Sequence, residues 1–220
     1  MALKVLIACE ESQRVCIEFR KLGHEAYSAD IQEPSGGHPE WHILGNVLNI
    51  LQGGQFDTMD KISHFVEKWD IIIAHPPCTY LSFAGYKYLN VEKYGEKAIK
   101  RLQLREEAFE FAMRCFNANC EHICMENPKG YINQKFRPPD QVINPFDFGD
   151  SERKRTCLWL KGLPPLMPDY QVPPPKPKRY SKNGKARWFV DSMCDRKERS
   201  KTFYGIARAM AYQFSNNFYL

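Results

Sequence analysis

The chain has 220 residues, 43% of them hydrophobic, a content that supports a packed core and argues against wholesale disorder. Its 31 basic and 26 acidic residues leave a net charge of +5, which permits a polyanionic partner without requiring one. No apolar run approaches the roughly 18 to 20 residues of a membrane span, and eight cysteines with no evident signal peptide favour reduced thiols in a cytoplasmic protein.

Apolar runs and helical spacing near the N-terminus predict the fold class. Strands are predicted at residues 3–8, 25–30, 69–74 and 122–125, and alternation of apolar and polar residues returns at 156–160. Val15, Phe19 and Leu22 recur at helical spacing between the first two strands. Ser12 before them and Gly23 after them are typical capping residues. This β-α-β start predicts an α/β, Rossmann-like fold with a mostly parallel sheet and helices on both faces.

The remaining segments are predicted to form a single domain over residues 1–220. Further helices are predicted at 60–68, 92–116 and 204–214, a loop at 32–42, and a strand or short helix at 45–51. Residues 173–187 combine four prolines with basic side chains, a composition that fits no helix or sheet interior. We expect this segment to be an exposed basic loop or linker.

The most distinctive chemistry lies at Cys78, just after the strand-like run at 69–74. Ligands of parallel sheets bind beyond the carboxyl ends of the strands, where Cys78 and Glu126 are both expected. Pro76 and Pro77 restrict the backbone and hold the cysteine in one place. Because a thiolate is a strong nucleophile, Cys78 is a candidate for covalent catalysis, whereas a buried structural cysteine is the alternative.

Residues 70–85 resemble the catalytic motif of the cytosine-C5 DNA methyltransferases. That motif is Pro-Pro-Cys followed by serine and glycine, which are Ser82 and Gly85 in this chain. Glu126-Asn127-Pro128 resembles the Glu-Asn-Val motif of the same family, with proline in place of valine. Weaker similarities at 27–31 and 45–47 extend the resemblance over roughly residues 3–130. It implies a class I methyltransferase-like fold.

The resemblance also implies a mechanism and a set of site residues. Cys78 would add to C6 of a cytosine, Glu126 would act as an acid at N3, and C5 would then accept a methyl group. Arg155, in the run Arg153-Lys154-Arg155-Thr156, would contact the base or its phosphate. The cofactor would be S-adenosylmethionine, and the resemblance implies no metal.

Four residues are expected at the S-adenosylmethionine site by the same resemblance. Ala8 ends the first strand, Asp30 would accept hydrogen bonds from the ribose, Ile31 would pack on the adenine, and Asn46 would contact its edge. The family's first motif is rich in glycine, whereas residues 8–12 of this chain contain none. The acidic Glu10 and Glu11 in this loop would repel a carboxylate or hold an ammonium group.

The substrate is expected to be DNA, either duplex or single-stranded, or a free pyrimidine nucleotide. The family's target-recognition domain is absent, and the basic segment 173–187 stands in its place. Its cations could contact phosphates and two aromatic residues could stack on bases. These residues are Lys176, Lys178, Arg179, Tyr180, Lys182, Lys185, Arg187 and Trp188.

Two further hypotheses and one excluded site complete the sequence-based predictions. An enzyme of similar chemistry could act on a free pyrimidine nucleotide, and the glycine-free first loop leaves room for a non-catalytic binding protein. A short enzyme of this kind would suit a phage or mobile element. Cys115, Cys120, Cys124 and His122 lack the usual spacing of zinc ligands, so no metal site is predicted.

Overall fold

The centre of the molecule is a seven-stranded sheet in the order β3-β2-β1-β6-β7-β9-β8. The structure is a computed structural model that describes residues 2–177, 179–184, 186–188 and 196–218. The sheet strands are β1 (Lys4–Ala8), β2 (Glu25–Asp30), β3 (His42–Leu44), β6 (Ile71–Ala74), β7 (His122–Asn127), β8 (Gln141–Ile143) and β9 (Thr156–Lys161). Strands β3, β2, β1, β6 and β7 are parallel, while β9 runs antiparallel to both β7 and β8. The mostly parallel α/β sheet predicted from the sequence is therefore confirmed.

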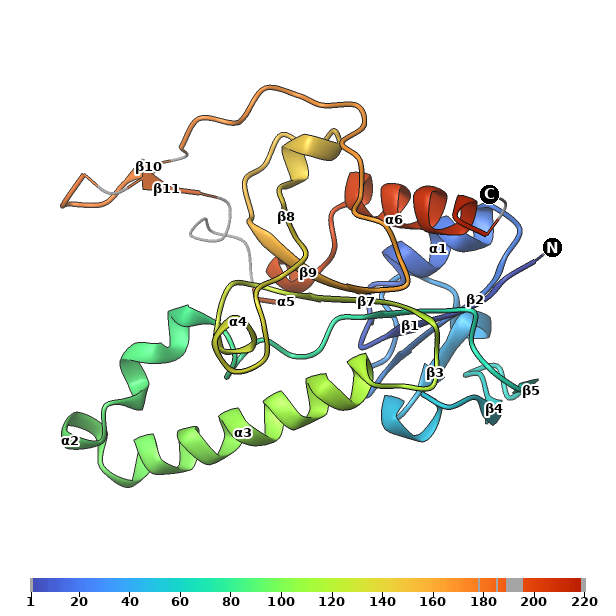
Figure 1. The fold of residues 1–220 in the computed structure, drawn as a ribbon, viewed down its shortest axis with the longest axis horizontal. Helices are drawn as coiled ribbons and strands as arrows, with labels where there is room; N and C mark the ends of the chain where they lie inside the picture. Colours follow the sequence, from blue (N-terminus) through green and yellow to red (C-terminus); the bar gives the residue numbers. More distant parts are fainter. Residues whose placement is uncertain (1, 178, 185, 189–195, 219–220) are drawn as a thin grey trace.

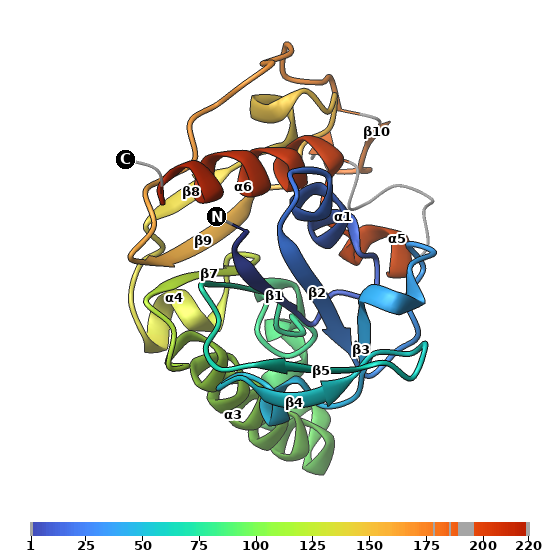
Figure 2. The same cartoon turned by 90° about the vertical axis from the view of Figure 1, so that its right-hand side faces the viewer.

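Helices pack on both faces of this sheet. Figure 2 shows α1 (Arg14–Lys21) and α6 (Tyr204–Asn216) on one face and α3 (Glu96–Phe116) on the other. The shorter helices are α2 (Val91–Tyr94), α4 (Tyr131–Lys135), α5 (Arg196–Ser200) and the 3₁₀ helices η1 (Pro39–Trp41), η2 (Val47–Asn49), η3 (Phe83–Leu89) and η4 (Pro145–Phe148). None of the described helices is both long and apolar enough to cross a bilayer.

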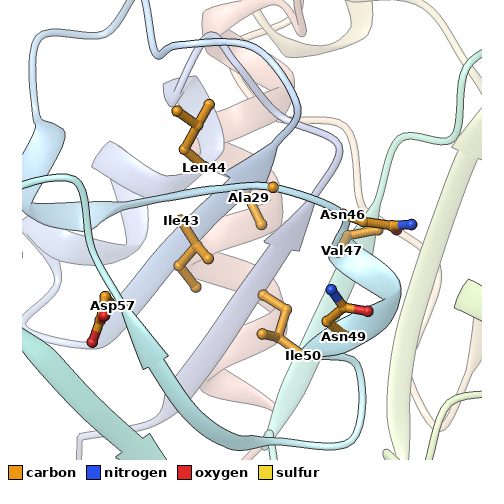
Figure 3. A pocket seen from close by; sticks show the side chains of 9 residues that line it. Ala29, Ile43, Leu44, Asn46, Val47, Asn49, Ile50 and Asp57 are labelled. Carbon is orange, nitrogen blue, oxygen red and sulfur yellow. The ribbon is translucent and has the colours of Figure 1, made fainter.

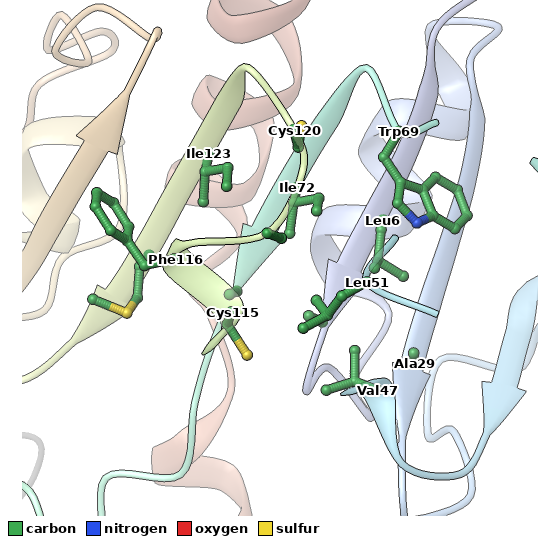
Figure 4. Close-up of a cluster of buried hydrophobic side chains, with 14 of the residues drawn as sticks. Leu6, Ala29, Val47, Leu51, Trp69, Ile72, Cys115, Phe116, Cys120 and Ile123 are labelled. Atoms are coloured by element: carbon green, nitrogen blue, oxygen red, sulfur yellow. The ribbon is translucent and has the colours of Figure 1, made fainter. Parts of the chain in front are cut away.

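The continuous apolar sequence of the central strands follows from this three-layer arrangement. Successive side chains of a strand point to opposite faces. Leu6 and Ile72 therefore pack with α3, as does Ile123 from β7 (Figure 4), whereas Ile7 and Ile73 pack with α1 and α6. Burying both faces excludes polar residues from these positions, which is why strands β1 and β6 could be predicted from the sequence.

Two of the three longer predicted helices differ in detail from the structure. Helix α1 ends at Lys21, so Leu22 lies at its C-cap and is half exposed instead of buried. The helix predicted at 92–116 is divided into α2 and α3 by Gly95, whose φ of 52° is left-handed. The terminal helix is confirmed, with Ile206, Met210 and Phe214 all buried.

The prediction of a helix at 60–68 is wrong, because this region forms the antiparallel hairpin of β4 (Gly54–Asp57) and β5 (Ser63–Val66). Its turn is held by side-chain hydrogen bonds. The Thr58 hydroxyl donates to Asp60 at 2.6 Å, and the same carboxylate accepts from the Ile62 amide at 3.3 Å. Such local bonds compete with helical ones.

Two short strands of the main sheet were missed, whereas the predictions of a strand or short helix at 45–51 and of a loop at 173–187 agree with the structure. Strands β3 and β8 were not predicted, and residues 45–51 contain the 3₁₀ helix η2. The segment 173–187 is largely without regular structure, except for the two-residue strands β10 (Arg179–Tyr180) and β11 (Ala186–Arg187). Figure 1 shows this small hairpin extending away from the sheet. Lys178 and Lys185 lie outside the described residues.

Candidate active site

The carboxyl ends of β1, β2, β6 and β7 meet at one edge of the sheet. Ala8 pairs in register with Ala29 on one side and with Ala74 on the other, and Ala74 pairs with Met125. The chain leaves β1 for β2 and β3, and later returns to the opposite side of β1 as β6. Such a reversal of strand order is where ligands of parallel sheets bind. The loops after β1 and β6 are thus the natural place for a site.

Cys78 lies in a tightly held loop after β6. Asn127 Nδ2 donates to the Pro76 carbonyl at 2.7 Å, and the Cys78 carbonyl accepts from the amides of Leu81 and Ser82 at 3.1 and 3.0 Å. The Leu81 side chain is fully buried, whereas Cys78 itself is exposed. The predicted stiffness of this loop thus has a hydrogen-bonded basis, and the thiol is accessible to a substrate.

A second set of contacts holds the same loop against the segment after β7. Ser82 forms an isolated antiparallel bridge with Gly130, and the Tyr131 amide donates to the Leu81 carbonyl at 2.7 Å. A Cβ atom on Gly130 would lie 1.9 Å from the Leu81 carbonyl oxygen. Glycine is therefore required here by close approach of two backbones, a need that the sequence alone does not reveal.

Glu126 contacts His75 across the neighbouring strand ends. The Oε2 atom of Glu126 lies 3.3 Å from Nδ1 of His75, and their side chains are only 17% and 10% exposed. Burial raises the pKa of Glu126, but the hydrogen bond with His75 and the positive charge of Lys154 more than offset it, so the pKa is lowered overall. Glu126 is therefore a charged carboxylate at neutral pH.

His75 keeps one ring nitrogen uncommitted within the described part of the chain. Its Nε2 atom is buried and has no hydrogen-bond partner there. The buried Glu10 interacts electrostatically with the same imidazole, which favours the charged form of that carboxylate. His75 thus lies between two carboxylates at the switch point of the sheet. His75 was not predicted as a site residue, although it directly precedes Pro76-Pro77-Cys78 in the sequence.

Lys154, and not Arg155, is the basic residue beside Glu126. A small pocket is lined by Glu126, Lys154, Thr156, Ser200, Thr202, Phe203 and Ile206. Lys154 Nζ also donates to the Arg199 carbonyl at 2.8 Å, while the Arg155 side chain is exposed to solvent. Lys154 is therefore partly buried beside Glu126 and Thr156, whereas the next residue, Arg155, faces solvent.

The loop after β1 contains no glycine, and instead has two non-glycine residues with left-handed backbone conformations and a buried glutamate. Cys9 and Gln13 both adopt left-handed backbone conformations, with φ of 61° and 57°. Glu10 accepts hydrogen bonds from the amides of Val15 at 2.7 Å and Cys16 at 3.2 Å, at the start of α1. Burial raises its pKa, although these amides and His75 oppose the shift. The chain thus supplies its own carboxyl group where a helix N-terminus could bind an anion.

The four residues predicted to hold a cofactor have different environments. Ala8 is buried in the core, with its carbonyl accepting from the His75 amide at 2.9 Å. The Asp30 carboxylate accepts from the Gln32 amide at 2.9 Å in a turn, and Ile31 is 78% exposed. Asn46 is exposed and caps η2 by accepting from the Leu48 amide at 3.0 Å. The structure therefore places Asp30, Ile31 and Asn46 at the accessible ends of β2 and β3.

A pocket of about 260 Å³ lies beside these strand ends (Figure 3). Its lining residues are Ala29, Ile43, Leu44, Gly45, Asn46, Val47, Asn49, Ile50 and Asp57. The walls combine aliphatic side chains with the amides of Asn46 and Asn49 and the carboxylate of Asp57. Such a mixture suits a flat, partly polar group better than a phosphate.

Cys120, which was considered as a zinc ligand, lies apart from this edge. Cys120 is buried near the opposite ends of the strands, with its thiol 3.6 Å from the Asp70 carbonyl and 3.2 Å from that of His122. The described residues contain no cluster of three or more His, Cys, Asp or Glu side chains suited to a metal. Trp188 lies under the guanidinium of Arg153, 4.6 Å from the ring centre, and Tyr180 is exposed on β10.

A scan of protein-family models and a search of curated proteins found no match for this chain.

Proposed function

We propose that the protein transfers a methyl group from S-adenosylmethionine to C5 of cytosine in DNA, through a covalent adduct with Cys78. The observation that carries the proposal is an exposed cysteine in the hydrogen-bonded loop after β6, together with a partly buried carboxylate at the end of the adjacent parallel strand β7. The order of the strands, with antiparallel β9 inserted beside β7, is compatible with a class I methyltransferase-like fold.

The residues at the edge of the sheet support the addition step of this reaction. The Cys78 thiolate adds to C6 of the cytosine, and the electron pair displaced from the ring moves toward N3. The Glu126 carboxylate takes up a proton from solvent before the addition and passes it to N3, while the contact with His75 Nδ1 holds Glu126 Oε2 in place. C5 is then nucleophilic and accepts the methyl group. Loss of the C5 proton to a base expels the Cys78 thiolate and restores the ring.

S-adenosylmethionine would supply an electrophilic methyl group next to C5. Its adenosine half would be held by Asp30, Ile31 and Asn46, beside the pocket beyond β2 and β3. The Glu10 carboxylate occupies the first amides of α1, so the loop after β1 favours the ammonium of the cofactor over its carboxylate.

Covalent trapping tests the proposal most directly. Oligonucleotides that contain 5-fluorocytosine, single-stranded and duplex, are incubated with the protein and S-adenosylmethionine. Fluorine cannot leave C5 as a proton does, so the adduct should persist and appear as a shifted band in denaturing gels. Cys78→Ala should abolish the adduct, and Glu126→Gln should slow it at least about a hundredfold. Absence of any adduct with either oligonucleotide would refute methyl transfer to DNA.

Two further measurements separate the alternatives. Turnover of dCMP without oligonucleotide binding would assign the chemistry to a free nucleotide. The first loop, with Glu10 bonded to the amides of α1, is the observation that favours a non-catalytic protein. Calorimetric titration with S-adenosylmethionine decides this point, since a non-catalytic protein with a closed first loop should release no heat of binding.

A further inference from the structure

Residues 79–105 form an arm that follows Cys78 and leads away from the sheet; we call it the aromatic arm. It contains η3, α2 and the first half of α3. Figure 1 shows α2 and the start of α3 at the lower left, beyond the ends of the strands, with the β10–β11 hairpin at the upper left. The arm therefore lies on the side of the molecule to which the carboxyl edge of the sheet opens.

Aromatic rings are concentrated on this arm, and two of them present large exposed surfaces. Phe83 is 38% exposed and Tyr88 is 44% exposed. Phe83 packs edge-on against Tyr86 at 4.8 Å, and the Tyr86 hydroxyl donates to Gln134 at 2.6 Å. Partly buried rings thus anchor the exposed ones, which leaves the outer rings available at a low cost in side-chain entropy.

Charge along the arm is strongly positive. Its basic residues are Lys87, Lys93, Lys97, Lys100, Arg101 and Arg105, against the acidic Glu92 and Glu96. The second half of α3 reverses this balance with Glu106, Glu107 and Glu110. The positive end of α3 is therefore the end that projects beyond the sheet, next to the candidate active site.

Arg101 links the arm to the loop of Cys78. Its Nη2 atom donates to the Thr79 carbonyl at 2.9 Å, and its guanidinium lies 4.9 Å from the ring centre of Tyr80 and 5.5 Å from that of Tyr88. A Cβ atom on Gly85 would lie 2.6 Å from the same nitrogen. The arginine is thus fixed between the reactive loop and the exposed rings, so a strand bound on the rings is held near Cys78.

We infer that the aromatic arm binds single-stranded nucleic acid. Exposed rings stack on the faces of unpaired bases, and the lysines contact phosphates along the strand. Base pairing and stacking hide those faces in a duplex, so the arm favours single strands. The inference names the substrate class of the proposed reaction and rests on that proposal for the role of Cys78.

A second protein molecule is the other occupant that an aromatic surface could accept. Two copies of this arm would bring like charges together, since each carries six basic and two acidic residues. A polyanion neutralises the same charges and uses the same rings. Charge complementarity therefore favours the nucleic acid.

Fluorescence anisotropy with a labelled oligothymidylate of about 20 nucleotides tests the inference without a cofactor or turnover. Tyr88→Ala and Phe83→Ala should each weaken binding about tenfold, because one stacked base is lost. The double variant Lys97→Glu, Lys100→Glu should weaken binding further and flatten its dependence on salt by about 0.7 per lost phosphate contact. Tyr212→Ala on α6 is the matched control, since this tyrosine is also exposed and lies on another helix.

The outcomes separate this inference from the proposed function. Tighter binding of the single strand than of its duplex, lost in the arm variants and kept in Tyr212→Ala, supports the inference even if no adduct forms with 5-fluorocytosine. Equal binding by Tyr88→Ala and the unaltered protein, or tighter binding of the duplex, overturns it even if an adduct does form. A dimer in sedimentation that Tyr88→Ala dissociates would also overturn it, because the arm would then be a protein interface.

Discussion

The charge of Glu126 depends on two neighbours that come from different parts of the chain. His75 lies directly after β6, at the start of the loop that carries Cys78, whereas Lys154 lies in the segment before β9. Together they keep the carboxylate ionised in spite of its burial. A carboxylate in this state can accept a proton and pass it on, which is what an acid that works in repeated cycles requires.

Lys154→Met tests this arrangement through stability. The pKa of Glu126 is lower in the folded state than the roughly 4.3 of an unfolded chain, so Glu126 stabilises the fold above that pH. This contribution disappears as the pH falls through the folded pKa. Removing Lys154 raises the pKa of Glu126, so the variant should lose about 1 to 2 kcal/mol near neutral pH and much less in acid. Urea unfolding at several pH values measures the difference.

The adjacent Arg155 offers a matched control for this experiment. Its side chain is exposed, so Arg155→Met should change the free energy of unfolding by less than about 0.5 kcal/mol at any pH. An equal pH dependence of the two variants would show that Lys154 does not act on Glu126.

Residue types explain why only part of the candidate site could be predicted from the sequence. Cys78 and Glu126 follow apolar strands directly, so strand prediction placed them at the sheet edge. His75 and Lys154 act through side-chain contacts between elements far apart in the chain, and such contacts depend on packing. Glu10 was recognised as an unusual acid, but its bonds to the start of α1 required the left-handed turn at Cys9 and Gln13.

Among the elements, the β4–β5 hairpin shows how local polar contacts override a helical pattern. Phe56 is buried between Tyr27 and Trp69, with ring centres 5.1 and 5.8 Å away, whereas Phe65 on the paired strand is 68% exposed. Phe56→Ala should therefore cost about 3 to 4 kcal/mol, and Phe65→Ala less than about 0.5 kcal/mol. Thermal or urea unfolding of both variants checks this contrast. Similar losses would mean that the hairpin does not cover the core.

The bridge between the loops after β6 and β7 leads to a second prediction at this scale. Gly130→Ala would force a Cβ atom against the Leu81 carbonyl, so it should cost more than about 2 kcal/mol and change the alkylation rate of Cys78. Gly37→Ala is the comparison, because Gly37 has a φ of 87° and open space around it, and only backbone strain of about 1 kcal/mol is expected. If both variants melt at the same temperature, the close approach is unimportant.

For the whole molecule, alkylation rates can test which cysteines lie in the core and which lie at the surface. Cys16, Cys115, Cys120, Cys124 and Cys157 are buried, while Cys78 is exposed. The contact with Cys115 and burial raise the pKa of Cys9, and burial raises those of Cys16 and Cys124. Of the seven described cysteines, Cys78 should therefore react first with iodoacetamide, as mapped by mass spectrometry of peptides. Reaction of the buried cysteines at the same rate would contradict the fold.

The overall architecture was accessible from sequence because its central strands are buried on both faces and its helices on one. The same reasoning failed at the margins of the molecule. Strands β3 and β8 have three residues each, too few for a periodic signal, and they exist because they pair with longer neighbours. Predictions from periodicity are reliable where burial dictates residue type, and weak where pairing alone fixes the backbone.

The hydrogen bonds from the start of α1 to Glu10 affect which ligands can bind at this end of the sheet. The carboxyl oxygens of Glu10 already accept hydrogen bonds from the first amides of α1, so they occupy the positions that a small anion would need. Sulfate or phosphate in a crystallisation screen should leave this turn unoccupied. Inhibitors built to fill the edge of the sheet will need a neutral or cationic head at this end, and carboxylate-bearing compounds will be selected against.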